Sequence, residues 1–161
     1  MPGGAWSWVT LAAALGCGLM AGVWFAFSGF VMAALNRLPA GSSVAAMQSM
    51  NRTAVRPPLM IAMFVTAALC VGLGVWAIRS WGDRRAALTL AGCVLYLVGT
   101  VGVTSAGNVP LNDKLDKVDA AGAAAGQGWS DYFGAWMAWN HARGILTAAA
   151  AALLTIALAR E

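Results

Sequence analysis

The residues best suited to chemistry lie close together in the stretch WMAWNHARG, Trp136–Gly144, which contains the only histidine of the chain, His141. If this stretch is helical, positions i, i+3, i+4 and i+7 form one face, which carries Trp136, Trp139, Asn140 and Arg143. His141 lies about 100° round the helix, at the edge of that face. An imidazole accepts protons near neutral pH, while a guanidinium and an amide donate hydrogen bonds to a developing oxyanion. The stretch therefore predicts proton abstraction with stabilisation of negative charge by His141, Arg143 and Asn140.

Two other polar segments contain amides that can join this group. MQSMNR (47–52) is predicted to lie on a short amphipathic helix that begins near Ser42 or Ser43. NVPLN (108–112) is predicted to end a helix, because Pro110 favours an extended Val109. The Ala/Gly-rich stretch 120–128 that follows is typical of a flexible linker. The residues expected to bind a substrate are Gln48, Asn51, Asn108, Asn112, Trp136 and Trp139.

The elements that must position these residues are membrane helices. Of the 161 residues, 60% are hydrophobic and 10% are charged, and the mean hydropathy is +0.71. Soluble domains carry about 25% charged residues, so this composition indicates a membrane protein. Uncharged runs predict a single transmembrane domain over 1–161, an all-α four-helix bundle. Its spans are predicted near Val9–Leu35, Leu59–Ile78, Ala86–Ala106 and Ala138–Ala159.

Four spans place the loops after the first and third helices on the same side of the membrane, so the three polar segments meet at one end of the bundle. Three arginines in the short 79–85 loop predict that this loop and both termini are cytoplasmic, in a plasma or inner membrane. The net charge of +4 forms no basic stripe, so no nucleic-acid partner is expected. Gly18 and Gly22 have GxxxG spacing, which suits either packing within the bundle or a homo-oligomer.

Sulfur-containing residues leave a metal-binding alternative open. Cys17, Cys70 and Cys93 lie in separate apolar runs without a CxxC motif and are expected to pack in the interior. A single histidine forms no zinc or haem motif, so no metal ligand is assigned. The methionines form two MxxM pairs, at 47/50 and 60/63, and soft thioethers favour Cu(I). The cofactor is therefore unknown from the sequence, with copper or haem binding as the alternative.

The motifs GVWFAFSGFVMAALNRLP, MQSMN, NVPLN and WMAWNHAR, in this order, resemble the anthrone-oxygenase-like family of small four-helix integral membrane proteins. The resemblance covers nearly the whole chain, although Ala33 stands where a proline is common in the family. It implies oxidation of a hydrophobic phenolic or polycyclic aromatic compound, of the anthrone-to-quinone type, with O2. The matching motif positions are Gln48, Asn51, Asn108, Pro110, Asn112, Trp139, Asn140, His141 and Arg143.

On this hypothesis His141 removes a proton from an acidic C–H group, and Arg143 with the asparagines stabilises the resulting enolate. Trp136 and Trp139 would stack on a flat substrate dissolved in the bilayer. A second interpretation is a copper-, haem- or small-molecule-binding membrane protein without oxygenase activity. A third is a non-catalytic subunit in which the Asn/Arg cluster only fastens loops to the bundle.

Overall fold

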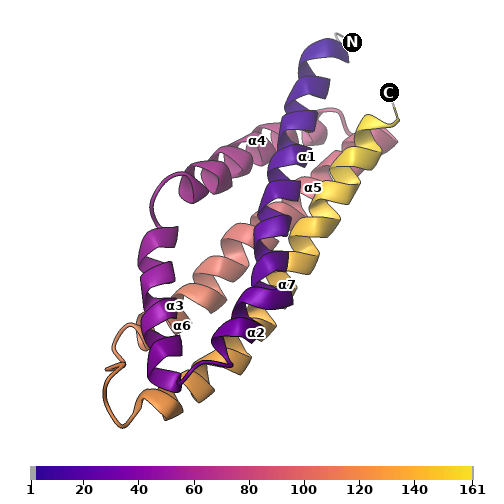
Figure 1. The fold of residues 1–161 in the computed structure, drawn as a ribbon. Helices are drawn as coiled ribbons and strands as arrows, with labels where there is room; N and C mark the ends of the chain where they lie inside the picture. Colours follow the sequence, from indigo (N-terminus) through magenta and orange to yellow (C-terminus); the bar gives the residue numbers. More distant parts are fainter. Residues whose placement is uncertain (1–2, 161) are drawn as a thin grey trace.

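The computed structural model describes residues 3–160, and within that range every regular element is helical. Figure 1 shows long helices running side by side, with both termini at one end and α3 and α6 at the other. The elements in chain order are α1 (Gly3–Ala26), η1 (Phe27–Val31), α2 (Met32–Leu35), α3 (Ala40–Ala54), α4 (Leu59–Arg79), α5 (Arg84–Tyr96), η2 (Leu97–Gly102), η3 (Thr104–Asn108), α6 (Val109–Leu115) and α7 (Ala125–Leu158).

Four of these helical stretches are long and apolar enough to cross a membrane, namely Gly4–Leu35, Leu59–Arg79, Arg84–Leu115 and Ala125–Leu158. The π-helical segments η1, η2 and η3 lie inside the first and third stretches and leave them continuous. The predicted helical membrane bundle is therefore confirmed, and the four apolar helices indicate an integral membrane protein. The short helix predicted in the first loop is α3, which begins at Ala40, slightly earlier than expected.

The four long helices form a ring in which α7 packs against α1 and α5, and α4 packs against the same two helices. Two hydrophobic cores stabilise the bundle, one inside this ring and one at the end where α3 and α6 lie. The first joins α1, α4, α5 and the second half of α7, and contains the three cysteines as buried packing residues. The second joins α2, α3, α6 and the first half of α7, around Met32, Met47 and Trp129. We call these the membrane core and the roof core.

The start of α7 corrects one prediction from the sequence. Residues 120–124 form turns that connect α6 to α7, but α7 begins at Ala125, so the predicted linker over 120–128 is wrong for residues 125–128. The helix is 34 residues long, which corresponds to about 51 Å and exceeds a hydrocarbon layer of about 30 Å. Its early turns are helical despite two glycines because Trp129, Tyr132 and Trp136 bury one face in the roof core. The first turns of α7 are therefore stabilised by tertiary packing and not by the intrinsic helix propensity of their residues.

Pro110 corrects a second prediction. The structure continues as a helix through this residue, and Val109 has helical dihedral angles, φ −61° and ψ −49°. A proline inside an α-helix loses a hydrogen bond and clashes with the carbonyl four residues earlier. Here Pro110 lies in the first turn of α6, directly after the wider π-helical turn η3, where those costs are smaller. The polar NVPLN segment therefore extends along a helix toward the roof rather than forming a loop.

Candidate active site

A cavity of about 270 Å³ lies where the membrane core and the roof core meet. Its walls come from α1, η1, α3, α4, η3, α6 and α7. Two of its residues, Trp24 and Met63, belong to the membrane core, and two others, Met47 and Trp136, belong to the roof core. Most of the wall is apolar, with four aromatic and four methionine side chains, and the polar residues are Asn51, Thr104, Ser105, Asn108, Asn112 and Arg143.

Arg143 is the only cationic side chain in the cavity wall and is only 4% exposed. Its guanidinium donates to Asn140 Oδ1 at 2.6 Å and to Thr104 Oγ1 at 3.1 Å. The guanidinium carbon lies 3.6 Å from the centre of the Trp24 ring, a cation–π contact. Among residues 3–160 the one ion pair is Arg52–Asp116, so no carboxylate neutralises Arg143. A buried charge of this kind is costly, about 2.5–3.5 kcal/mol on insertion scales, and is normally retained for a function.

Asn140 lies behind Arg143 and is completely buried. Its amide nitrogen donates to the Trp24 carbonyl oxygen at 2.9 Å and to Ser28 Oγ at 2.7 Å, which ties α7 to α1 and η1. Its amide oxygen is then left to accept from Arg143. Asn140 does not line the cavity, so its effect on a bound molecule would come through the position of the guanidinium.

Several buried polar atoms of the cavity residues have no hydrogen-bond partner. They are Trp24 Nε1, Asn51 Nδ2, Asn108 Oδ1 and Arg143 Nε. Buried polar groups in native proteins are nearly always paired. Four unpaired polar atoms on the residues of one cavity therefore indicate a ligand or water that forms hydrogen bonds with them. Three of the atoms are donors and one is an acceptor. The cavity therefore suits a ligand with an electron-rich oxygen and a hydroxyl group.

Hydrogen bonds along α3, α6 and α7 hold the remaining amides. Asn112 Oδ1 accepts from Tyr132 Oη at 2.8 Å and from Trp136 Nε1 at 3.0 Å, which fixes both rings beside the cavity. Gln48 Nε2 donates to the carbonyl oxygens of Leu115 and Val118, both at 2.9 Å. Gln48 therefore fastens α3 over the end of α6 and lies outside the cavity wall.

The structure thus separates the predicted site residues into two groups. It brings Arg143, Asn108, Asn112, Asn51 and Trp136 to one cavity, with Asn140 directly behind. It does not bring Gln48, Trp139 or His141 into that cavity.

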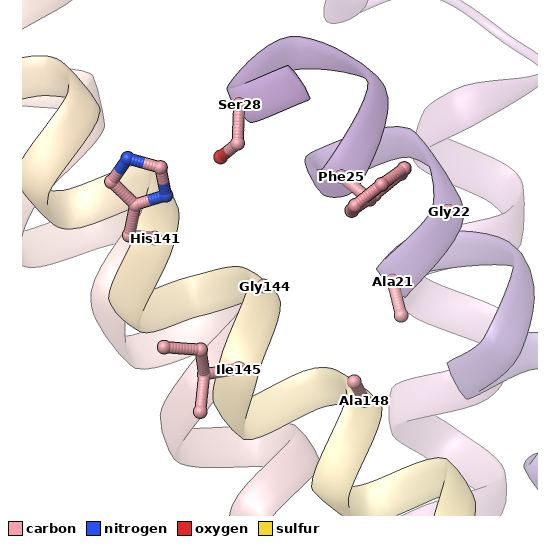
Figure 2. A pocket seen from close by; sticks show the side chains of 8 residues that line it. All are labelled: Ala21, Gly22, Phe25, Ser28, His141, Gly144, Ile145 and Ala148. Carbon is pink, nitrogen blue, oxygen red and sulfur yellow. The ribbon is translucent and has the colours of Figure 1, made fainter.

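The positions of Trp139 and His141 explain their absence from the cavity. Trp139 is 43% exposed, and its ring lies against Gly107. His141 is exposed and lines a separate groove between α1 and α7, opposite Ser28 (Figure 2). The expectation that His141 shares one pocket with Arg143 is therefore wrong, because a one-residue step along a helix turns a side chain to a different face. Its role as a general base stays a prediction.

Among the residues of the cavity wall, sequence reasoning missed Trp24, Phe27 and Thr104. Trp24 lies in the motif GVWFAFSGFVMAALNRLP, but its contact with Arg143 depends on how α1 packs on α7, and neither helix sequence alone indicates it. Thr104 and Asn108 face the cavity from η3, while Phe27 does so from η1. A π-helical turn rotates the following side chains relative to an α-helix, and such turns recur at functional sites. Their positions do not follow from a 3.6-residue period.

The two MxxM pairs do converge, since Met47, Met50, Met60 and Met63 all line the cavity. The same wall carries the Arg143 guanidinium, which repels a Cu(I) ion, and thioethers also pack well against aromatic rings. Among the described residues, no group of three or more His, Cys, Asp or Glu side chains could hold a metal ion. The methionines therefore suit a flat aromatic ligand better than a metal. Stoichiometric copper in the purified protein would reverse this interpretation.

A family model described as anthrone oxygenase matches residues 53–153, which is more than half of the chain. The match includes the part of the cavity built by α4, η3, α6 and α7, and ends before the last turns of α7. No curated protein and no solved structure matches the chain significantly.

Proposed function

The chain belongs to the anthrone oxygenase family, and on that premise we propose that its cavity binds a planar hydroxylated polycyclic ketone and oxidises it with O2 to a quinone. The observation that carries this proposal is the buried Arg143, which has no carboxylate partner among the described residues and faces an aromatic and thioether cavity. An enolate of an aromatic ketone supplies both the missing negative charge and the flat apolar body. The volume of about 270 Å³ suits a compact ring system, since pockets for larger ligands are about 300–1,000 Å³.

The proposed reaction begins with transfer of a proton to a water molecule from the methylene carbon that faces the ketone across the central ring, and a proton from water later converts the peroxide anion into the hydroperoxide. The resulting enolate carries its charge mainly on oxygen, where Arg143 and the donors Trp24 Nε1 and Asn51 Nδ2 stabilise it. A hydroxyl group beside the ketone donates to Asn108 Oδ1. The enolate carbon then bonds to O2, and the hydroperoxide that forms loses water to give the second carbonyl. The substrate loses two hydrogens and gains one oxygen, and the other oxygen leaves as water.

We test this function by oxygen uptake and quinone absorbance with purified protein in lipid nanodiscs. The substrate is 1,8-dihydroxyanthrone, and the comparison compound is anthracene, which has the same ring shape but no ketone to form an enolate. We expect turnover of the first and none of the second. Empty nanodiscs correct for spontaneous oxidation. Uptake no faster than in empty nanodiscs, by metal-free and by metal-loaded protein alike, would overturn the proposal.

The predicted base, His141, is tested separately. We expect His141→Phe to lower kcat by less than about tenfold, because a general base must lie within hydrogen-bond reach of the proton it removes and His141 does not line the cavity. The measurement is kcat for 1,8-dihydroxyanthrone across pH 5–9 in both proteins. A loss of about 100-fold or more would restore His141 as the base.

Entry of the substrate from the bilayer fits the exposed residues of the cavity wall. Val55, Phe64 and Val109 line the cavity and are also 68%, 57% and 42% exposed, so its mouth is apolar. We place the end of the bundle with Arg79, Arg84 and Arg85 in the cytoplasm by the positive-inside rule, in a plasma or inner membrane. The cavity then lies near the opposite membrane boundary. Labelling of single cysteines from each side of sealed vesicles measures this orientation.

A further inference from the structure

A second hollow lies on the other side of the contact between α1 and α7, away from the cavity. It is an open groove of about 390 Å³ with a floor of small residues, including Gly22 and Gly144. Figure 2 shows the His141 ring and the Ser28 hydroxyl at one end of the groove, on the two facing helices. Phe25 and Ile145 form its sides, and both are largely exposed. The groove therefore has one polar end and an apolar remainder.

The two polar groups at that end have hydrogen-bonding capacity that the described residues do not use. His141 forms no hydrogen bond within residues 3–160. Ser28 Oγ accepts from Asn140, and no acceptor for its own hydroxyl proton is present in that range. An imidazole and a hydroxyl without protein partners can both pair with one polar head group.

The depth of the groove fits an amphipathic lipid-soluble molecule. His141 lies 19 residues before Arg160, about 28 Å along α7, which is close to the hydrocarbon thickness of about 30 Å. If Arg160 lies at one membrane boundary, the polar end of the groove lies near the other. The apolar part, toward Ala21 and Ala148, points to the middle of the bilayer. A polar head and an apolar tail can occupy these two parts together.

The residues that line the groove indicate which kind of polar head group it can bind. No lysine or arginine lines the groove, so it offers no cation to a phospholipid phosphate. His141 and Ser28 instead suit a neutral carbonyl or hydroxyl oxygen. The exposed Phe25 ring can stack on a flat ring, and the glycine floor leaves room for one. We propose that this groove binds a lipid-soluble quinone or quinol, with a head oxygen at His141 and Ser28 and its tail along the α1–α7 contact.

The test uses an azido-benzoquinone with a decyl chain, photo-crosslinked to the full-length protein in nanodiscs of zwitterionic lipid. We expect labelled peptides to map to 21–28 and 141–148. Gly22→Leu places a side chain in the groove, where an added Cβ atom meets nothing within 4 Å, and it should lower labelling at least about tenfold. Gly72→Leu is the matched control on α4, where an added Cβ atom also meets nothing within 4 Å, and it should not change labelling. Label outside these peptides, or undiminished label in Gly22→Leu, overturns the proposal.

Further outcomes separate a quinone from other occupants. His141→Phe keeps a flat ring but removes the hydrogen bond, and should also weaken labelling, whereas a purely steric groove would not respond. Displacement of the probe by phosphatidylglycerol nanodiscs would assign the groove to a phospholipid instead. A change from dimer to monomer in Gly22→Leu, measured by native mass spectrometry, would assign it to a second copy of the chain. None of these measurements uses the anthrone assay. The proposal for the groove and the proposed function are therefore tested independently, and one can be overturned without the other.

Discussion

Replacing Arg143 with methionine is expected to lower kcat/KM for 1,8-dihydroxyanthrone at least about 100-fold, equivalent to about 3 kcal/mol of transition-state stabilisation. Methionine retains much of the side-chain volume but removes the charge that faces the cavity. The enolate would then form in an apolar cavity without a counter-charge, and loss of one oxyanion donor alone commonly costs 100-fold or more in enzymes. Oxygen uptake under initial-rate conditions provides the measurement.

The same change should leave the melting temperature close to that of the wild type. Removing a buried cation that has no carboxylate partner stabilises the folded state. Leaving Asn140 Oδ1 without its hydrogen-bond donor destabilises the folded state, so the two effects largely cancel. This combination distinguishes a catalytic arginine from a structural one. If Arg143 only fastened α7 to its neighbours, activity and melting temperature would fall together. Arg56→Met, at an exposed position outside the cavity, is the matched control and should change neither.

Replacing Gly99 with valine is expected to destabilise the bundle by about 2–3 kcal/mol, as overpacking a tight contact does. A Cβ atom at Gly99 would lie 2.5 Å from Leu146 Cβ and 3.5 Å from its backbone, so η2 and α7 could not keep their present separation. Close approach through small residues is the main way in which membrane helices associate. The measurement is thermal unfolding of the detergent-solubilised protein, followed by tryptophan fluorescence.

Gly102 provides a control for that experiment within the same π-helical segment. A Cβ atom there meets its nearest neighbour, the Leu97 carbonyl oxygen, at 3.7 Å, which is ordinary contact. Gly102→Val should therefore unfold within a few degrees of the wild type. Equal destabilisation by both changes would mean that valine disturbs η2 itself and that the contact with Leu146 is unimportant.

The helical membrane bundle could be predicted from the sequence because long uncharged apolar runs are typical of helices that cross the hydrocarbon layer of a membrane. The extension of α7 could not, because Trp129, Tyr132 and Trp136 become helix-stabilising only when α2, α3 and α6 pack on them. The prediction that the helix ends at Pro110 was wrong for a related reason. The π-helical turn that precedes Pro110 and accommodates it has no recognisable sequence pattern.

For the candidate site, helical spacing correctly placed Asn140 and Arg143 on one face, and the hydrogen bond between them follows from it. Loop order correctly brought Asn51 and Asn108 to the same end of the bundle. The sequence could not reveal that His141 faces outward, because one helix gives only relative directions and the partner helices set which direction is inside. Nor could it reveal the ring of Trp24 over Arg143, which depends on the contact between α1 and α7.

The position of the cavity between two separate cores has a consequence for how such proteins diversify. On the proposed function, Arg143 and the Trp24 ring that it contacts would meet the charge of a bound molecule, and Trp24 belongs to the membrane core. Met47 and Trp136, which would limit the shape of the ligand, belong to the roof core, which we expect to lie outside the bilayer. Substitutions in the roof core can change which ring systems fit without disturbing insertion or the shared chemistry. Related proteins with new substrates should therefore differ mainly in α3, α6 and the first turns of α7.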